Sequence, residues 1–187
     1  FNHHISCLYG LISMEKFEEI KIYIEKLTEE TKEYNEIINV GNPILTSLLN
    51  VKITQAKNKK INIEMNIDIN KELSIEYIDL SIIVGNLLDN AIEACEKVEE
   101  DNRYAEVDIY TKMNNLIIKV INSKPSEIEL KEKINKEGFT TKQDAENHGF
   151  GLKNIKQIVE KCRGIIKIED EGDVFKVNIA IPIKSDL

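Results

Sequence analysis

Two asparagines and a glutamate stand at regular helical spacing in the segment DLSIIVGNLLDNAIEACEK, which begins at Asp79. Asn86, Asn90 and Glu93 are separated by four and three residues, so they share one face of a helix. Asp79 and Asp89 lie near the same side. The other face is apolar and consists of Leu80, Val84, Leu87, Leu88, Ala91 and Cys95.

Asparagine is a weak helix former, because its side chain competes for backbone hydrogen bonds. A functional reason for Asn86 and Asn90 would be magnesium, which takes hard oxygen ligands and obtains most of them from water and phosphates. An amide oxygen supplies a ligand without adding negative charge beside a triphosphate. The alternative is a solvated helix face that carries two asparagines by chance.

A glycine pair precedes a second amphipathic helix in the segment GFTTKQDAENHGFGLKNIKQIVEKC. Gly149 and Gly151 would let the backbone approach a ligand closely, and a helix N-terminus offers free N–H groups to anions. Thr141 and Lys142 add a hydroxyl and a cation nearby. The segment is no Walker loop, and a Rossmann fingerprint fails because Asn154 occupies the third glycine position. Alone, the pair also fits a flexible loop that starts a helix.

The elements that must position these residues follow from hydrophobic periodicity. A helix capped by Asn42, with Pro43 in its first turn, extends to about Lys60, and a second helix begins with Ser74 as its cap. The predicted order of elements begins with helices, and most of the strands form antiparallel hairpins. This order predicts an α/β fold, a two-layer α/β sandwich. The remaining predicted elements are a strand at 61–69, the second helix to Val98, strands at Tyr104–Lys112 and Asn115–Asn122, a loop at 123–147, a helix at Gly151–Cys162, and strands at 165–170 and 174–182.

The N-terminal part of the chain has a different pattern. Apolar residues on one helical face are followed by a break near Met14–Glu15 and by a second apolar series with alternating steps of three and four. This pattern predicts an antiparallel helical hairpin at 1–38 that pairs with a second copy, or one that packs on its own globular domain. The second series consists of Phe17, Ile20, Ile24, Leu27, Thr31, Tyr34 and Ile38.

Composition narrows the class of protein. The net charge of −8 argues against nucleic acid as the main partner, because that binding neutralises phosphates. No run of residues approaches the roughly 20 apolar positions of a membrane helix. The three cysteines are far apart in the sequence, and no two of them form a CxxC motif. This spacing fits reduced thiols in the cytoplasm.

Together the two motifs resemble the ATP-binding domain of the superfamily shared by DNA gyrase, Hsp90, histidine kinases and MutL. NLLDNAIEA resembles the asparagine box of histidine kinases, and HGFGLKNIKQIVEKCRG resembles their second glycine box. The similarity covers about residues 42–183, so we predict a catalytic ATP-binding domain at 42–187. The resemblance is strongest to quorum-sensing kinases of the accessory-gene-regulator type and to citrate/dicarboxylate sensor kinases.

The resemblance implies roles for individual residues and two cofactors, ATP and Mg²⁺. Asn90 would be the Mg²⁺ ligand, with Asn86 one turn earlier as a catalytic and nucleotide-binding residue. ATPases of the superfamily carry a catalytic glutamate at the position of Asn86. The absence of this glutamate favours phosphotransfer over hydrolysis. The residues implied along the triphosphate are Thr141, Lys142, Gly149, Gly151, Leu152, Lys153 and Asn154.

One departure from the superfamily pattern concerns the base of the nucleotide. The DxGxG box that holds adenine is missing, and Asn122 stands at the position of its aspartate in VINSKPSEI. An amide oxygen still accepts a hydrogen bond from the adenine amino group, without charge and without neighbouring glycines. The interpretation is weaker nucleotide binding, not loss of function.

The phosphoacceptor pattern of related kinases, H-[DE]-F-x-N-[HK]-L-x-x-I-x-G-L, fits the N-terminus with its phenylalanine at Phe1. His3 and His4 then occupy the Asn and [HK] positions, and Gly10 falls on the pattern's glycine. The acceptor histidine and its acidic neighbour would therefore immediately precede Phe1. We predict that neither His3 nor His4 is the acceptor.

The resemblance as a whole implies a cytoplasmic fragment of a two-component sensor histidine kinase whose full-length form lies in the cell membrane. It would pass the γ-phosphoryl group of MgATP to a histidine and then to a response-regulator aspartate, and it would form a homodimer through its N-terminal helices. A membrane would be contacted only through a segment outside this chain. The alternative is a phosphorelay or scaffold protein that keeps the fold and binds no nucleotide; an ATPase of the gyrase or Hsp90 kind is disfavoured by Asn86.

Overall fold

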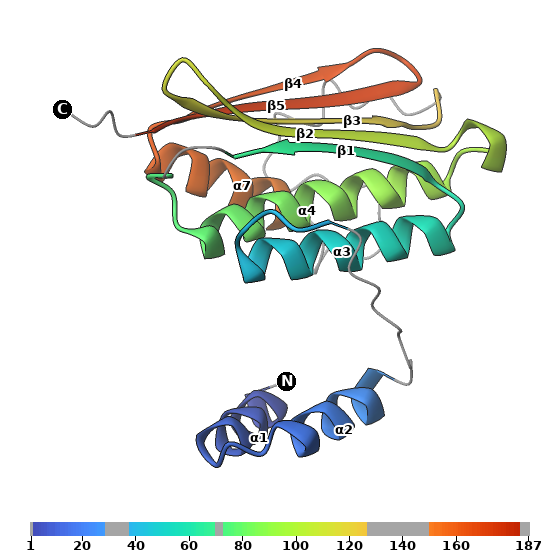
Figure 1. The fold of residues 1–187 in the computed structure, drawn as a ribbon. Coiled ribbons are helices and arrows are strands. Elements are labelled where there is room, and N and C mark those ends of the chain that lie inside the picture. The colour runs from blue at the N-terminus through green and yellow to red at the C-terminus, as the bar shows by residue number, and fades with distance from the viewer. Residues whose placement is uncertain (1, 29–37, 70–72, 127–149, 184–187) are drawn as a thin grey trace. The chain divides into compact units, whose positions relative to one another are not determined.

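The computed structural model describes residues 2–28, 38–69, 73–126 and 150–183 of the 187-residue chain (Figure 1). The chain divides into two compact units, Phe1–Asn35 and Glu36–Leu187. Each unit has its own secondary structure.

The smaller unit is a helical hairpin of α1 (Asn2–Ser13) and α2 (Phe17–Thr28). Glu15 turns the chain between them with a positive φ of 55°, and the Lys16 amide donates to the Leu11 carbonyl at 3.0 Å. His4, near the start of α1, lies 3.0 Å from the Tyr23 hydroxyl in the second half of α2, so the helices are antiparallel. The predicted hairpin and its break are confirmed.

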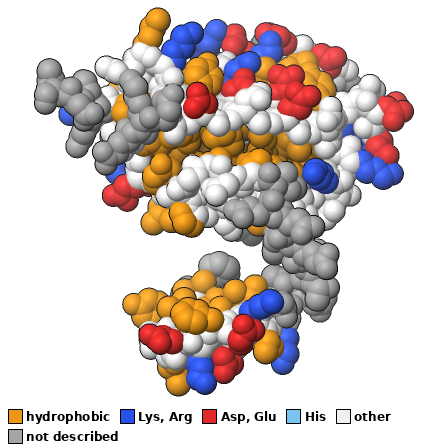
Figure 2. All heavy atoms as spheres, viewed as in Figure 1, with side chains coloured by type: hydrophobic (Ala, Val, Ile, Leu, Met, Phe, Trp, Pro, Cys, Tyr) orange, Lys and Arg blue, Asp and Glu red, His pale blue; other side chains and the backbone are white. Residues whose placement is uncertain are grey.

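Much of the apolar surface of this hairpin is exposed. Figure 2 shows hydrophobic side chains gathered over α1 and α2, and those of Tyr9 and Phe17 are 73% and 65% exposed. Such a surface fits the predicted pairing with another helical element, which stays a prediction. The predicted seam is wrong at its last position: Ile38 is outside any helix and packs against the core of the larger unit, where Asn50 holds its backbone. Thr31 and Tyr34 lie outside the described residues.

The larger unit is built from three helices and a five-stranded sheet in its described part. The strand order is β1-β2-β3-β5-β4; β1 and β2 pair in parallel and the other neighbours are antiparallel. In Figure 1 the helices lie on one face of the sheet, so the predicted two-layer α/β sandwich is confirmed. Its elements are α3 (Pro43–Asn58), β1 (Asn62–Asp68), α4 (Tyr77–Glu96), the 3₁₀ turn η1 (Glu100–Asn102), β2 (Tyr104–Lys112), β3 (Asn115–Ser123), α7 (Phe150–Lys161), β4 (Ile165–Asp170) and β5 (Val174–Pro182).

Helix α3 begins as its sequence predicts. The Asn42 side chain accepts hydrogen bonds from the amides of Ile44 and Leu45 at 3.0 and 3.1 Å, and Pro43 follows it. Replacing Asn42 by alanine is expected to destabilise the larger unit by about 1 kcal/mol, because two amides of the first turn lose their acceptor. Urea unfolding followed by circular dichroism would measure the loss.

The matched control is Asn58→Ala at the other end of α3, where the asparagine is exposed and makes no side-chain hydrogen bond to the described residues. Its change should stay within about 0.5 kcal/mol. Equal effects of the two variants would contradict the capping role of Asn42.

The start of α4 differs from the prediction. The helix begins at Tyr77, with Glu76 at the cap position and no side-chain capping bond, so Ser74 is not the cap. The Ser74 hydroxyl instead donates to the Pro182 carbonyl at 2.6 Å and ties this segment to the end of β5. A tertiary partner has replaced the local one.

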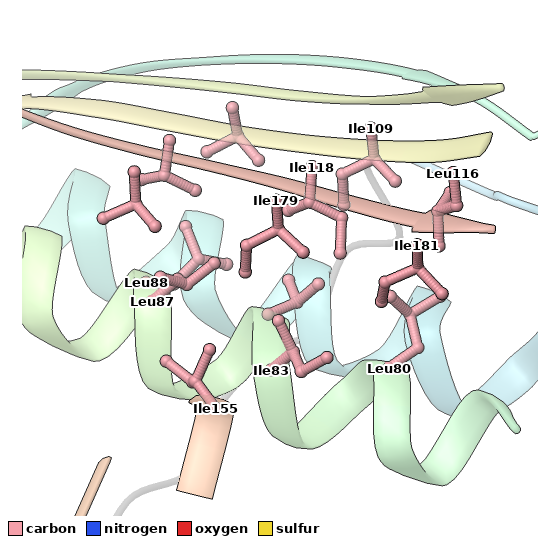
Figure 3. Close-up of a cluster of buried hydrophobic side chains, with 14 of the residues drawn as sticks. Leu80, Ile83, Leu87, Leu88, Ile109, Leu116, Ile118, Ile155, Ile179 and Ile181 are labelled. Carbon is pink, nitrogen blue, oxygen red and sulfur yellow. The ribbon is translucent and has the colours of Figure 1, made fainter. Parts of the chain in front are cut away.

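The core lies between α4 and the sheet. In Figure 3, Leu80, Ile83, Leu87 and Leu88 of α4 lie opposite strand residues such as Ile118, and Ile155 of α7 adjoins the same cluster. The apolar face predicted for α4 is buried at all six of its positions. Among the described residues, no helix combines the length and the apolar character that crossing a membrane would require.

Candidate functional site

The outer face of α4 carries the predicted amides. Because the opposite face of the helix packs on the sheet, Asn90 is exposed and Asn86 is half-buried. The Asn86 amide nitrogen donates to the Ile82 carbonyl at 2.7 Å, so its oxygen Oδ1 is turned away from its own helix backbone. The Asn90 side chain makes no hydrogen bond within the described part of the chain, which leaves its amide available to a ligand.

The start of α7 lies against this face. A Cβ placed on Gly151 would lie 3.0 Å from Asn86 Oδ1, closer than most carbon contacts. Glycine therefore lets the two helices approach closely at this point, because any side chain on residue 151 would displace the Asn86 amide. The structure thus brings together Asn86 and Gly151, which are 65 positions apart in the sequence.

Other predicted residues of the second motif lie on the first turns of α7. Leu152 is half-buried against the core, while Lys153 and Asn154 are exposed. The first four N–H groups of a helix lack partners within the helix, so this end of α7 favours anions. Thr141, Lys142 and Gly149 lie outside the described residues.

Ion pairs hold the helices that carry the site. Lys161, at the end of α7, lies 2.9 Å from Asp79 near the start of α4, so the two helices run antiparallel. Hydrogen bonding to Asp79 raises the pKa of Lys161 above its usual value. On the other side of α4, Asp89 lies 2.6 Å from Lys52 of α3. Both aspartates near the amide face therefore take part in helix–helix contacts.

Asn122 lies at the end of β3 and is buried, with only 3% of its surface exposed. Its amide nitrogen donates to the Ser123 carbonyl at 2.9 Å. The Cys95 thiol lies 3.6 Å from the same carbonyl, and burial raises the pKa of this thiol, which keeps it protonated. Sequence reasoning singled out Asn122 but missed Lys124, which is also buried and follows two residues later.

The donor set limits which metal the site could hold. Within the described ranges there is no group of three or more His, Cys, Asp or Glu side chains able to hold a metal ion. Amide oxygens on a helix surface instead suit a hard cation that takes one or two ligands from protein and the rest from phosphate and water. The residues present thus fit a magnesium–nucleotide complex.

Comparison with known proteins gives the same indication. The family model described as "GHKL domain" matches residues 75–182, which is more than half of the chain. A probable C4-dicarboxylate sensor kinase of Halalkalibacterium halodurans is 29% identical over 186 residues, covering 95% of this chain and 35% of that protein. The sensor histidine kinase DpiB of Escherichia coli is 27% identical over 187 residues, covering 94% of this chain and 34% of that protein.

A solved structure shows the same fold. The catalytic domain of the histidine kinase ThkA superposes with a TM-score of 0.58 at 24% identity, covering 78% of this chain and 93% of that domain. The present chain spans about a third of the length of the two sensor kinases it matches.

Proposed function

This chain belongs to the GHKL domain family, and from that membership we propose that it contains the ATP-binding catalytic part of a sensor histidine kinase. In this proposal the γ-phosphoryl group of MgATP passes to a histidine and then to an aspartate of a response regulator. The observation that carries the proposal is the approach of Gly151 to Asn86, because it joins an amide-bearing helix face to a helix N-terminus.

The residues have separate roles in the proposal. Asn90 is the protein's ligand to the metal, and Asn86 binds beside it and orients the triphosphate. Gly151, Leu152, Lys153 and Asn154 lie along the phosphates, where backbone N–H groups and a cation offset their charge. When bound, Mg²⁺ would neutralise charge on the phosphate oxygens as the phosphoryl group leaves.

The same residues favour transfer over hydrolysis. Hydrolysis needs a base that takes a proton from water, and a neutral amide at residue 86 cannot act as one. The Asn86 nitrogen is also engaged with the Ile82 carbonyl. The side chain can therefore bind and orient a ligand but does not activate water.

The remaining parts of the proposal concern the whole protein. The exposed apolar side chains of α1 and α2 support a homodimer formed through these helices, and the relatives that align along the chain are sensor kinases. We place the chain in the cytoplasm, as part of a protein held in the cell membrane by a segment outside residues 1–187. Nucleic acid has no role in this proposal.

The test is a calorimetric titration with a non-hydrolysable ATP analogue, with and without Mg²⁺. We expect binding that Mg²⁺ strengthens. In Asn90→Ala this Mg²⁺-dependent gain should fall by about tenfold or more, because a metal ligand is lost. Binding without Mg²⁺ should change little.

Asn58→Ala serves as the matched control, since it removes an exposed helical asparagine from α3, a helix that carries none of the proposed site residues. Its affinities should equal those of the unmodified chain. No binding under either condition would contradict the proposal and favour the scaffold alternative. Steady phosphate release from ATP that Asn86→Ala abolishes would instead indicate an ATPase.

A further inference from the structure

The corner of the sheet where β3 ends has a high density of buried polar side chains. Of the seven buried polar or charged residues in the described part of the larger unit, four lie here. They are Asn122, Ser123, Lys124 and Asp170. Such a concentration is unusual for the end of a strand, because each buried polar group must find a partner.

A buried ion pair forms the centre of this corner. The Lys124 ammonium lies 3.2 Å from Asp170 Oδ1, and the two side chains are only 2% and 6% exposed. The same carboxylate oxygen accepts from the Gly172 amide at 3.2 Å, and the Lys124 amide donates to the Asp173 carbonyl at 2.8 Å. The pair therefore fastens the exit of β3 to the turn between β4 and β5.

The strand register places Asp170 of this ion pair in the same row as the residue proposed to bind the base, with one residue between them. Asn122 of β3 and Asp170 of β4 both pair with Phe175 of β5, one from each side. Directly paired residues point to the same face of a sheet. Asn122, Phe175 and Asp170 therefore form one row on the face that the helices cover.

The orientation of the Asn122 amide is fixed within this row. The Ser123 carbonyl can only accept, so the group that faces it at 2.9 Å is the amide nitrogen. The oxygen Oδ1 of Asn122 is then the atom of this amide that remains able to accept a hydrogen bond. An acceptor at this position suits the exocyclic amino group of adenine and opposes the carbonyl oxygen of guanine.

We propose that the Lys124–Asp170 ion pair positions Asn122, and that these three residues together determine selectivity for an adenine base. The inference rests on the proposed function, since it concerns the base of the same nucleotide. A buried ion pair often adds little to the stability of the fold, because apolar residues of similar volume stabilise a protein equally well at many such positions. A positioning role explains why charges are present at the end of β3.

The experiment compares three probes: a non-hydrolysable ATP analogue, the corresponding GTP analogue and inorganic tripolyphosphate. The double variant Lys124→Met/Asp170→Leu removes both charges of the ion pair together, so neither is left buried without the other. We expect the preference for the ATP analogue over the GTP analogue to fall about tenfold, the effect of one lost hydrogen bond of ordinary strength. Affinity for tripolyphosphate should stay the same, because it has no base.

Three further variants separate positioning from folding. Lys124→Arg keeps an ion pair and should retain the preference, whereas Asp170→Asn is nearly isosteric and should lose it even if the double variant does not fold. Lys119→Met/Asp108→Leu removes a lysine–aspartate pair of similar length, 3.4 Å, that joins β2 and β3 and is more exposed, and it should leave the preference unchanged.

An unchanged preference in the folded double variant and in Asp170→Asn would overturn the inference, and so would equal weakening of all three probes. Both results leave the proposed function intact, because the unmodified chain still binds the ATP analogue. Failure of the unmodified chain to bind that analogue is a different outcome. It would remove the proposed function and this inference together.

Discussion

Gly151→Val is expected to weaken binding of a non-hydrolysable ATP analogue by about 100-fold, the effect of a displacement on the order of 1 Å in a functional site. The Cβ alone would lie 3.0 Å from Asn86 Oδ1, and valine adds two carbons beyond it. Asn86 would have to leave the rotamer in which it donates to the Ile82 carbonyl. The start of α7 would also move away from α4, so both halves of the proposed site change.

Gly151→Ala should also weaken binding of the ATP analogue, but by less than Gly151→Val. A single methyl group requires the Asn86 side chain to shift by only a few tenths of an ångström. Gly85→Ala is the matched control, since it adds a methyl group to α4 one residue before Asn86, at an ordinary 3.6 Å from Leu48. Binding by this variant should be unchanged. A well-folded Gly151→Val variant with full affinity would show that the contact between α4 and α7 does not shape the site.

Elements with a strong period could be predicted from the sequence. The predicted strand β2 has the observed bounds, Tyr104–Lys112, because its buried residues Ala105, Val107 and Ile109 alternate with more exposed ones and a turn follows at Met113 and Asn114. Met113 and Asn114 in this turn both have positive φ, as a tight hairpin with a right-handed twist requires. Where local chemistry decides the structure, the pattern was sufficient.

Features that depend on a distant partner could not be predicted. Ser74 has the chemistry of a helix cap, yet Pro182, more than a hundred residues later, takes its hydroxyl. Lysine is rarely buried, and only the fold brings Asp170 to Lys124. The parallel pairing of β1 with β2 likewise depends on the crossover through α4 and not on the period of either strand.

The same distinction applies to the candidate site. Asn86 and Gly151 could each be selected from a local motif, but neither motif contains their contact. The orientation of the Asn122 amide depends on its hydrogen bond to the Ser123 carbonyl. Because every residue type has a backbone carbonyl, the sequence does not show which one accepts this bond. Residue types predicted the kind of ligand, whereas the orientations of the amides required the fold.

Leu88→Ala is expected to lower the free energy of unfolding of the larger unit by about 2–5 kcal/mol, the range for a fully buried leucine truncated to alanine. Leu88 has no exposed surface and lies between α4 and the sheet (Figure 3). The substitution removes apolar area and leaves a cavity that a close-packed interior fills only in part. Urea unfolding would show an earlier midpoint with an unchanged slope.

Ile78→Ala is the control on the same helix, because Ile78 is 59% exposed and its loss should change the free energy of unfolding by about 0.5 kcal/mol or less. Leu88 and Asn90 point to opposite sides of α4, so the folded Leu88→Ala protein should bind the ATP analogue with unchanged affinity. Asn90→Ala should show the reverse, with weaker binding and normal stability. If Leu88→Ala weakened binding as much as Asn90→Ala while still folded, the two faces of α4 would not have the separate roles that we propose for them.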